Sequence, residues 1–281
     1  MVKFGPSGNC KSFYEAGYKH SKDAAKWLSE IGLDHYEYSF GKGIILSEAT
    51  ALVIGEEMRK YNISISVHAP YYINFATPTD EMADKSIMYV VNSIEKLKLL
   101  GGDRVVVHPA SCGKMTREEA VQLTKERLVK LYEVLKEKGL DDVYICLETM
   151  GKQAQIGTYQ EIIDFCKIAP NYIPTFDFGH INALGQGCLK TKEDYLNIFK
   201  LAIKEIGFEK VDKCHIHFSK IEYSAKGEVK HLTLEDQLYG PEFKPLAEAI
   251  KELNLNPIVV CESKEVMALD ALEMKKIYNS I

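Results

Sequence analysis

The stretch Val143-Tyr-Ile-Cys-Leu-Glu148 decides how the rest of the chain is interpreted. Five apolar or aromatic residues in a row predict a buried strand, and this strand ends in a carboxylate. Five other short apolar runs also deliver an acidic or imidazole side chain at or just beyond their ends. These runs are 64–68 with His68, 104–108 with His108, 172–177 with Asp177 and the nearby His180, 211–215 with His215 and His217, and 257–262 with Glu262.

The order of strands and helices predicts the fold. Strands are expected at 2–5, 35–38, 64–68, 104–108, 143–148, 172–177, 211–215 and 257–262, and helices at 22–31, 47–61, 79–100, 116–139, 159–168, 192–206, 242–253 and 264–278. Eight strands in strict alternation with eight helices favour an α/β fold, a closed (β/α)8 TIM barrel, over an open doubly wound sheet. We expect one domain, 1–281, with a turn at 41–43 and a polar lid or extended loop at 219–241.

Length and composition agree with a single large α/β domain. The chain has 281 residues, a net charge of -5 and 46% hydrophobic residues, and (β/α)8 barrels run to about 250 residues. No apolar run is long enough for a membrane span, and the N-terminus lacks a signal-peptide layout. The seven scattered cysteines indicate reduced thiols in a cytoplasmic protein. A monomer is expected. Mild acidity argues against a simple basic nucleic-acid coat but leaves room for a local positive groove.

Taken singly, the polar strand ends have ordinary interpretations. A lone His after a strand is more often a hydrogen-bonded core or loop residue, Glu148 can be an ion-pair partner, and the spacing of Asp177 and His180 also suits an Asx turn. Taken together, they indicate a metal site, because all strand carboxyl ends of such a barrel open onto one face. Carboxylate and imidazole are ligands for zinc, manganese or iron. Glu148, Asp177 and Glu262 can hold more than one divalent ion, and ions about 3.5–4 Å apart suit in-line displacement at phosphorus.

Matching stretches along most of the chain carry a family resemblance. The chain resembles the endonuclease IV family of apurinic/apyrimidinic endonucleases, within the xylose-isomerase-like barrels. The stretches are His68-Ala-Pro-Tyr-Tyr-Ile-Asn74, Val107-His-Pro109, Leu147-Glu-Thr-Met-Gly151, Phe176-Asp-Phe-Gly-His180, His215-Ile-His-Phe-Ser-Lys220, His231 and Cys261-Glu-Ser263.

The resemblance implies a zinc phosphodiesterase that cleaves DNA 5′ to abasic sites in base-excision repair, with Glu148 and Glu262 as catalytic residues. Two or three Zn²⁺ are expected, and Mn²⁺ is an alternative ion. By this analogy His68, His108 and Glu148 hold one zinc, Glu148 bridges to a second held by Asp177, His215 and Glu262, and His180 and His231 hold the third. Tyr71 matches a family residue that wedges into DNA, Tyr72 is its neighbour, and Lys220 is a candidate phosphate contact.

The chain departs from the family pattern at several positions. Val229 stands where the family has a third-zinc aspartate, with Glu228 one residue away as a substitute. His217 replaces an expected Asn, and Leu238-Tyr-Gly-Pro-Glu242 stands where a Gly-Glu-Gly usually follows. Phe40-Gly-Lys-Gly-Ile44 replaces a loop that carries an intercalating Arg. Whether Glu228 or His217 is a ligand is left open at this point.

Two other functions remain open. A sugar isomerase or epimerase on the same barrel would need only Glu148, Asp177, His215 and Glu262, around one Mn²⁺ or Co²⁺. The extra pair His68 and His108 favours hydrolysis, whereas the missing aspartate and altered DNA loops favour the isomerase. A metal-dependent barrel that binds a partner without catalysis is the third interpretation, and the complete ligand set argues against it.

Overall fold

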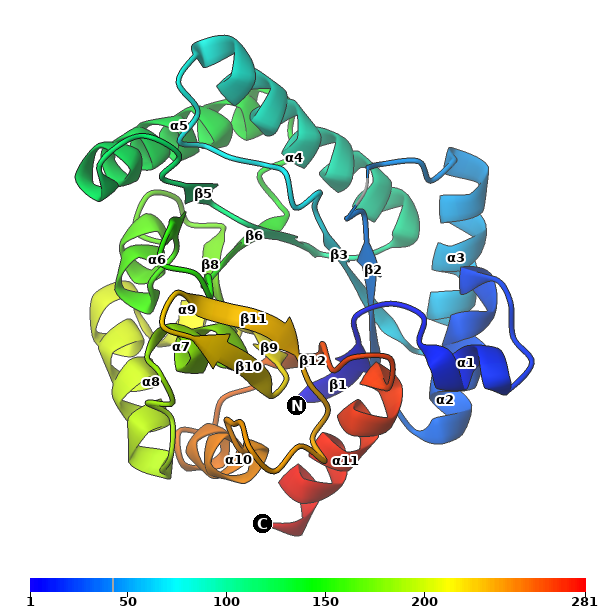
Figure 1. Cartoon of the computed structure of the whole chain (residues 1–281). Coiled ribbons are helices and arrows are strands. Elements are labelled where there is room, and N and C mark those ends of the chain that lie inside the picture. The colour runs from blue at the N-terminus through cyan, green and yellow to red at the C-terminus, as the bar shows by residue number, and fades with distance from the viewer. Residues whose placement is uncertain (42) are drawn as a thin grey trace.

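Eight short parallel strands form one sheet that curls around a central axis (Figure 1). The computed structural model describes residues 1–41 and 43–281, and Lys42, in the predicted turn 41–43, lies outside the described residues. The strands follow the order β1-β12-β9-β8-β6-β4-β3-β2, and a parallel bridge between Ser7 and Glu37 brings the first edge beside the last. Their bounds are β1 Lys3–Pro6, β2 His35–Ser39, β3 Ser64–His68, β4 Arg104–Val107, β6 Tyr144–Glu148, β8 Tyr172–Asp177, β9 His215–Phe218 and β12 Ile258–Cys261.

Helices cover the outside of this sheet (Figure 1). The outer helices are α2 Ala24–Ile31, α3 Glu48–Lys60, α4 Asp80–Leu100, α5 Arg117–Glu137, α6 Tyr159–Phe165, α8 Lys192–Ile206, α10 Phe243–Glu252 and α11 Met267–Ser280. Two helices have well-defined ends: Thr116 and Glu119 form a capping box before α5, and Gly101 takes the left-handed conformation after α4. The predicted (β/α)8 barrel is therefore confirmed.

Short elements interrupt the strict alternation that the sequence predicted. Four of them are helical and two are strands: α1 Lys11–Glu15, the 3-10 turn η1 Ser21–Asp23, α7 Phe178–Leu184, α9 Phe208–Asp212, β5 Ala110–Ser111 and β7 Gln155–Ile156. The strand predicted at 211–215 was placed too early, because Val211 and Asp212 end α9 and the strand begins at His215. Val211 is buried in the hydrophobic core although it lies on a helix, so its apolar side chain does not require a strand at this position.

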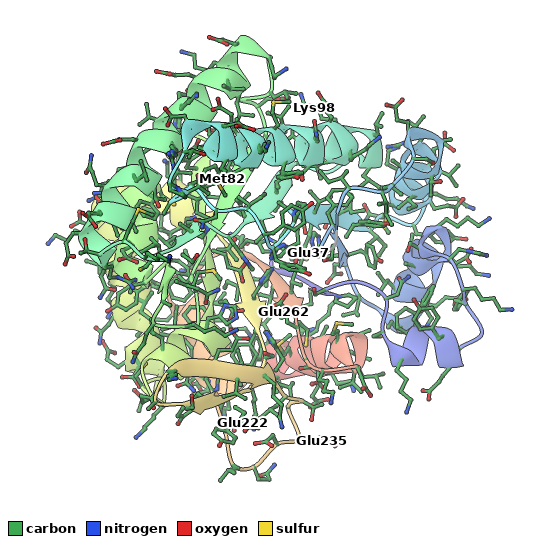
Figure 2. All side chains as sticks on the ribbon, turned by 45° about the horizontal axis from the view of Figure 1, so that its top comes forward. Glu37, Met82, Lys98, Glu222, Glu235 and Glu262 are labelled. Carbon is green, nitrogen blue, oxygen red and sulfur yellow. The ribbon has the colours of Figure 1, made fainter. Side chains whose placement is uncertain are left out.

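The inner face of the barrel is polar. Side chains alternate along each strand, so residues two apart project to the same side. Along β2 the buried His35 and Glu37 share this face, and their register partners on β3 are Ser64 and Ser66. Figure 2 shows Glu37 and Glu262 near the centre of the molecule, whereas Lys98, Glu222 and Glu235 lie at its periphery. The packed hydrophobic core lies mainly between the sheet and the helices, where Phe4, Phe176 and Phe199 are buried.

A two-stranded hairpin lies over the mouth of the barrel, where the sequence predicted a lid or extended loop (Figure 1). Its strands are β10 Ile221–Ser224 and β11 Gly227–His231, and they pair in antiparallel fashion. The Glu228 backbone N–H donates to the Gly151 carbonyl at 2.9 Å, which fixes the hairpin to the loop after β6. Gly227 has φ +99, and a Cβ there would lie 2.1 Å from the same carbonyl oxygen, so this close approach requires glycine.

Across residues 1–41 and 43–281, none of the helices has the length and hydropathy needed to cross a membrane.

Candidate metal centre

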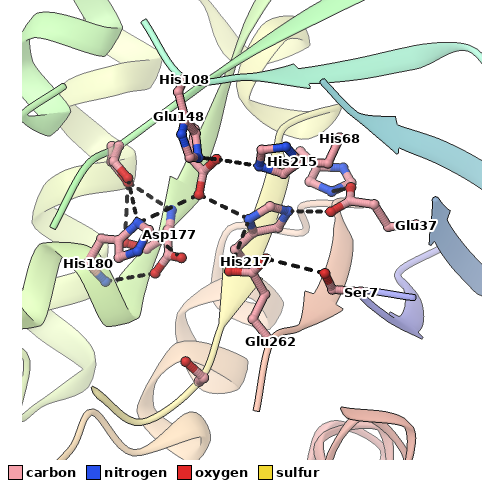
Figure 3. Close-up of polar contacts among 12 residues, drawn as sticks. Ser7, Glu37, His68, His108, Glu148, Asp177, His180, His215, His217 and Glu262 are labelled. Carbon is pink, nitrogen blue, oxygen red and sulfur yellow. Dashed lines mark hydrogen bonds and ion pairs between the residues drawn. The ribbon is translucent and has the colours of Figure 1, made fainter. Parts of the chain in front are cut away.

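The Glu148 carboxylate lies at the centre of the polar side chains at the barrel mouth (Figure 3). Its Oε2 is 3.1 Å from Nε2 of His68 and 3.0 Å from Nε2 of His108. Its Oε1 is 3.2 Å from Nδ1 of His217. The side chain comes from the last residue of β6, so the alternation of the strand turns it inward while Leu147 packs in the outer core. Glu148 thus presents one oxygen to His68 and His108 and the other to His217, and one ligating atom each of His68, Glu148 and His217 lies within 4.8 Å of the others.

A second group surrounds the other oxygen of Glu148. One ligating atom each from Glu148, Asp177, His217 and Glu262 lies within 4.8 Å of the others. Three of these side chains are buried, and Glu262 is partly exposed to the mouth. Its Oε2 is 3.6 Å from His217 Nδ1, and its Oε1 accepts a hydrogen bond from Ser7 Oγ at 3.4 Å. Three carboxylates and one imidazole in this space form a compact oxygen-rich ligand set.

A third group joins the barrel to the hairpin. His180 Nε2 is 3.5 Å from Glu228 Oε2, and His231 Nε2 is 3.9 Å from Glu228 Oε1. His180 lies in the first turn of α7, where the Asp177 side chain caps the helix by accepting the His180 backbone N–H at 2.7 Å. Gly151 leaves room for this group, because a Cβ there would come within 2.9 Å of both His180 and Glu228. The Val229 side chain is exposed on the hairpin.

His215 is the predicted ligand that the structure places elsewhere. It starts β9 and faces inward like His217, since residues two apart on a strand share a face, but it lies two residues deeper in the barrel. Two residues along a strand span about 6.5 Å, which separates the two imidazoles into different layers. His215 Nε2 contacts Glu37 Oε2 at 3.0 Å, and it is His217 that reaches Glu148, Asp177 and Glu262. His68, His108, Asp177, His180, His231 and Glu262 all gather at the mouth with Glu148.

Glu37 was missed by sequence reasoning. It follows a Tyr in the run His35-Tyr-Glu-Tyr38, a pattern typical of a short amphipathic strand with its charge toward solvent. The structure buries it fully, and its Oε1 lies 3.0 Å from Nε2 of His217. The available signal was the alternation of His35 and Glu37, which places two polar side chains on the inner face of a barrel strand.

The three predicted DNA contacts have different surroundings. Tyr71 is 57% exposed and lines the cavity above Glu148. Tyr72 is also exposed, but its ring packs edge-on against the ring of Tyr89, with 4.9 Å between the ring centroids. Lys220 is only 3% exposed, and its Nζ donates to the Asp236 carbonyl and to Glu242. The predicted phosphate contact at Lys220 does not agree with this position, because the ammonium group holds the segment after the hairpin and is turned away from solvent.

A cavity of about 350 Å³ opens above these groups. His68, His108, Glu148, His180 and Glu262 all line it. A larger cavity of about 590 Å³ lies outside the barrel, beside Lys19, His20 and Thr50. Its described lining residues include no carboxylate, so the chemistry of the ligand groups belongs to the smaller one.

The charges in the centre are paired, and this pairing shifts several pKa values. Burial alone would raise the pKa of Glu148, but His108 and His217 hold the pKa of that carboxyl well below its ordinary value. Burial alone would lower the pKa of His68, yet Glu148 raises it to about 9. The pKa of His180 is also raised to about 9, by Asp177 and Glu148 against the effect of burial. His215 differs: burial lowers its pKa to about 4, so it is a neutral imidazole.

The residues fit divalent cations by two criteria. Asp177 Oδ2 is buried and has no hydrogen-bond partner among the described residues, and a cation would satisfy this lone pair. The donors are carboxylate oxygens and imidazole nitrogens, converging on shared points as metal ligands do. His68 Nδ1 lies 2.7 Å from the Ala69 carbonyl, a contact that orients the ring with Nε2 toward Glu148.

Comparison with known proteins agrees with the barrel fold. The model of the family described as xylose isomerase-like TIM barrel matches residues 25–276. An uncharacterized protein of Methanocaldococcus jannaschii is 28% identical over 256 residues, 90% of each chain, and a probable endonuclease 4 of Aquifex aeolicus is 23% identical over 95% of this chain and 98% of its own. Among solved structures, a D-tagatose 3-epimerase-like protein superposes with a TM-score of 0.73 (21% identity, 99% and 97% covered). Endonuclease IV from Thermus thermophilus does so with 0.71 (17% identity, 99% and 97% covered).

These two structural matches show the fold, and several endonuclease 4 sequences are relatives of this chain. Because the family model covers most of the chain, the protein belongs to the xylose isomerase-like TIM barrel family.

Proposed function

We propose that the protein is a metal-dependent phosphodiesterase that hydrolyses the DNA backbone 5′ to abasic sites, with zinc as its metal. The observation that carries the proposal is the position of Glu148, whose Oε2 faces His68 and His108 while its Oε1 faces His217. A carboxylate in this position is suited to bridge two cations. The endonuclease 4 relatives support the same choice of reaction.

The roles of the residues follow from their positions. His68, His108 and Glu148 would hold one ion, and Glu148, Asp177, His217 and Glu262 the next. Paired divalent ions supply Lewis-acid stabilisation and an activated nucleophile for displacement at phosphorus. Glu262 lines the cavity, where its carboxylate can accept a proton from an attacking water, so Glu148 and Glu262 are the proposed catalytic residues. The exposed Tyr71 forms part of the cavity wall and is placed to contact a distorted DNA strand.

Glu228 supports a third ion in this proposal. Its carboxylate lies between His180 and His231, one residue before Val229, the position where the resemblance leads one to expect an aspartate. One imidazole from the barrel, one from the hairpin and this carboxylate give three protein ligands, the number found in open zinc sites. The proposed assignment therefore uses His217 in place of His215 and Glu228 in place of Val229.

The deciding experiment combines metal counting with cleavage of a defined substrate. Zinc-loaded protein is expected to nick a duplex that carries one abasic site, to leave the undamaged duplex intact, and to lose activity on chelation. His108→Asn removes a ligand of the first ion and should abolish nicking, whereas His20→Asn, a change at an exposed imidazole beside the outer cavity, should leave it unchanged. Zinc-loaded protein that fails to nick the abasic duplex would rule the proposal out.

A sugar epimerase is the second candidate, and one observation favours it. Glu148, Asp177, His217 and Glu262 form a complete one-metal group without His68 and His108, and the cavity of about 350 Å³ has room for a monosaccharide. One Mn²⁺ per chain together with interconversion of ketose epimers would establish this function. Two or three zinc ions with abasic-site cleavage would exclude it.

The proposed function also fits the environment expected from the cysteines. All seven are unpaired, and Cys146, Cys166, Cys214 and Cys261 are buried. Reduced thiols suit the cytoplasm, where a DNA-repair enzyme would meet its substrate.

A further inference from the structure

We infer that Glu37 is a positioning residue that fixes the His217 ring with Nδ1 toward Glu148, Asp177 and Glu262. This inference rests on the proposed metal-dependent function and adds a supporting carboxylate to it. Glu37 lies on β2, where it forms a parallel bridge with Ser7, the residue just after β1. It is separated in sequence from every ligand in the centre.

The Glu37 carboxylate contacts two imidazoles at once. Its Oε1 is 3.0 Å from His217 Nε2, and its Oε2 is 3.0 Å from His215 Nε2 (Figure 3). All three side chains are completely buried. A carboxylate buried among two imidazoles has no water to turn toward, so its orientation determines theirs.

A chain of hydrogen bonds holds Glu37 in this orientation. Ser66 Oγ donates to Glu37 Oε2 at 2.8 Å, and His35 Nε2 is 2.9 Å from the same hydroxyl. The other His35 nitrogen is 2.9 Å from Ser64 Oγ, which donates to the Asp34 carbonyl at 3.1 Å. These contacts tie the carboxylate to the backbone at the bottom of the barrel and leave Oε1 free for His217.

The consequence for His217 is a fixed division of its two ring nitrogens. If the proton lies on Nε2, the atom 3.0 Å from the Glu37 carboxylate, the lone pair of a neutral imidazole is on Nδ1. Nδ1 is the atom 3.2 Å from Glu148 and 3.6 Å from Glu262. Metal-ligating histidines generally donate their second nitrogen to a carboxylate or carbonyl, which fixes both tautomer and ring orientation. Glu37 fills that role here.

Glu37, His215 and His217 could instead hold a metal ion themselves, since one ligating atom of each lies within 4.8 Å of the others. This alternative is weaker, because the three side chains are wholly enclosed and a metal site needs a route for the ion to enter. A metal ligand and a positioning residue make different predictions for metal counts, so the experiment separates them.

The test measures Co²⁺ and Zn²⁺ affinity of the whole chain by competition with a chelator, together with the visible spectrum of bound Co²⁺. Glu37→Gln keeps the shape but replaces one oxygen with a donor. We expect about 10–100-fold weaker binding, the usual effect of losing such a partner, with an altered Co²⁺ spectrum and an unchanged number of ions at saturation. Asp270→Asn is the control, because Asp270 is a buried carboxylate outside the candidate ligand groups that accepts the Leu234 backbone N–H.

Ser66→Ala provides a second variant, since it removes one hydrogen bond to Glu37 and leaves the carboxylate in place. It should also lower the metal affinity, but by a smaller factor than Glu37→Gln. If Glu37→Gln does not fold, Ser66→Ala alone tests the inference. Wild-type affinity and spectrum in both variants would overturn the inference, as would loss of one whole metal equivalent with the remaining ions bound normally. Wild-type protein that binds no metal would defeat the proposed function and this inference with it, whereas metal binding without abasic-site cleavage would defeat the proposed function and leave this inference standing.

Discussion

The proposed ligands on the barrel strands and those on the hairpin are held in different ways. Glu148, Asp177 and His217 project from strands with a neighbour on each side, and they are buried. Glu228 and His231 project from a two-stranded hairpin that rests on the loop after β6, and both are partly exposed. A two-stranded hairpin is only marginally stable without such support. We therefore expect the two ions in the barrel to bind more tightly than the third.

The strongest test of this difference is Glu148→Gln. The change removes the proposed bridge between the two barrel ions and leaves His68, His108 and His217 without their common anion. Removing one partner from a buried ion pair costs about 3–5 kcal/mol, so the metal-free protein should unfold at lower urea concentration. Both barrel ions should be lost and the third retained. Retention of two ions by the variant would show that Glu148 is not the bridge.

A pH series offers the next largest effect. Because the pKa of His68 is raised to about 9, its imidazole is charged at neutral pH in the metal-free protein. Metal binding needs the neutral ring and must release that proton, so affinity should rise about tenfold per pH unit for each proton released, up to about pH 9. The stability of the metal-free protein should change the other way: a raised pKa contributes stability that is complete below about 6.5 and is lost as the pH rises through about 9.

Chelator competition between about pH 6.5 and 9.5 and urea unfolding of the metal-free protein measure these two opposite trends. Affinity that stays constant over this range would mean that His68 is neutral before the metal binds, or that it is not a ligand.

Gly227→Ala tests the hairpin separately from the barrel. A Cβ at this position would lie 2.1 Å from the Gly151 carbonyl oxygen, and the residue has φ +99. Strain of this kind costs about 1–3 kcal/mol, and the hairpin should relieve it by moving away from the loop after β6. The third ion should be lost while the two barrel ions remain, which zinc analysis after dialysis against a weak chelator can count.

The matched control is Gly139→Ala, because Gly139 also has a positive φ, +63, but a Cβ there meets nothing within 4 Å. It should lower the free energy of unfolding by a similar amount, because the backbone strain is similar, without changing the number of bound ions. Equal zinc content in the two variants would show that the hairpin does not hold the third ion.

The same contrast explains what could be predicted from sequence. Strand ends such as Glu148 and His68 were found because a buried apolar run followed by a polar residue has a clear signal, and the barrel then brings the ends together. The hairpin was predicted only as a lid, since the surrounding stretch 219–241 is rich in polar and charged residues and the turn at Ala225 and Lys226 has no Asn-Gly signature.

Three residues show where the sequence was insufficient. His215 and His217 share one face, and alternation alone gives the face but not the depth, so the choice between them needed the register of β9. Lys220 opens a polar, Lys- and Glu-rich stretch of the sequence, but the fold buries its ammonium group against Glu242. Such contacts between distant residues depend on packing that no local pattern encodes.

The smallest expected effect concerns the rim of the mouth on the side of β3. Tyr71 lines the cavity, whereas Tyr72 is held against Tyr89, so the two exposed rings should differ in what they contribute to DNA binding. A ring that stacks on an unpaired base contributes about 1–3 kcal/mol. Tyr71→Ala should therefore weaken binding of an abasic duplex, measured with the inactive His108→Asn background, by roughly tenfold at constant salt, in line with the low end of that range. Tyr72→Ala should change it much less, because its ring is already packed. Equal losses in both would show that the aromatic surface acts as a whole, and no loss in either would place the DNA contact on the hairpin side of the mouth.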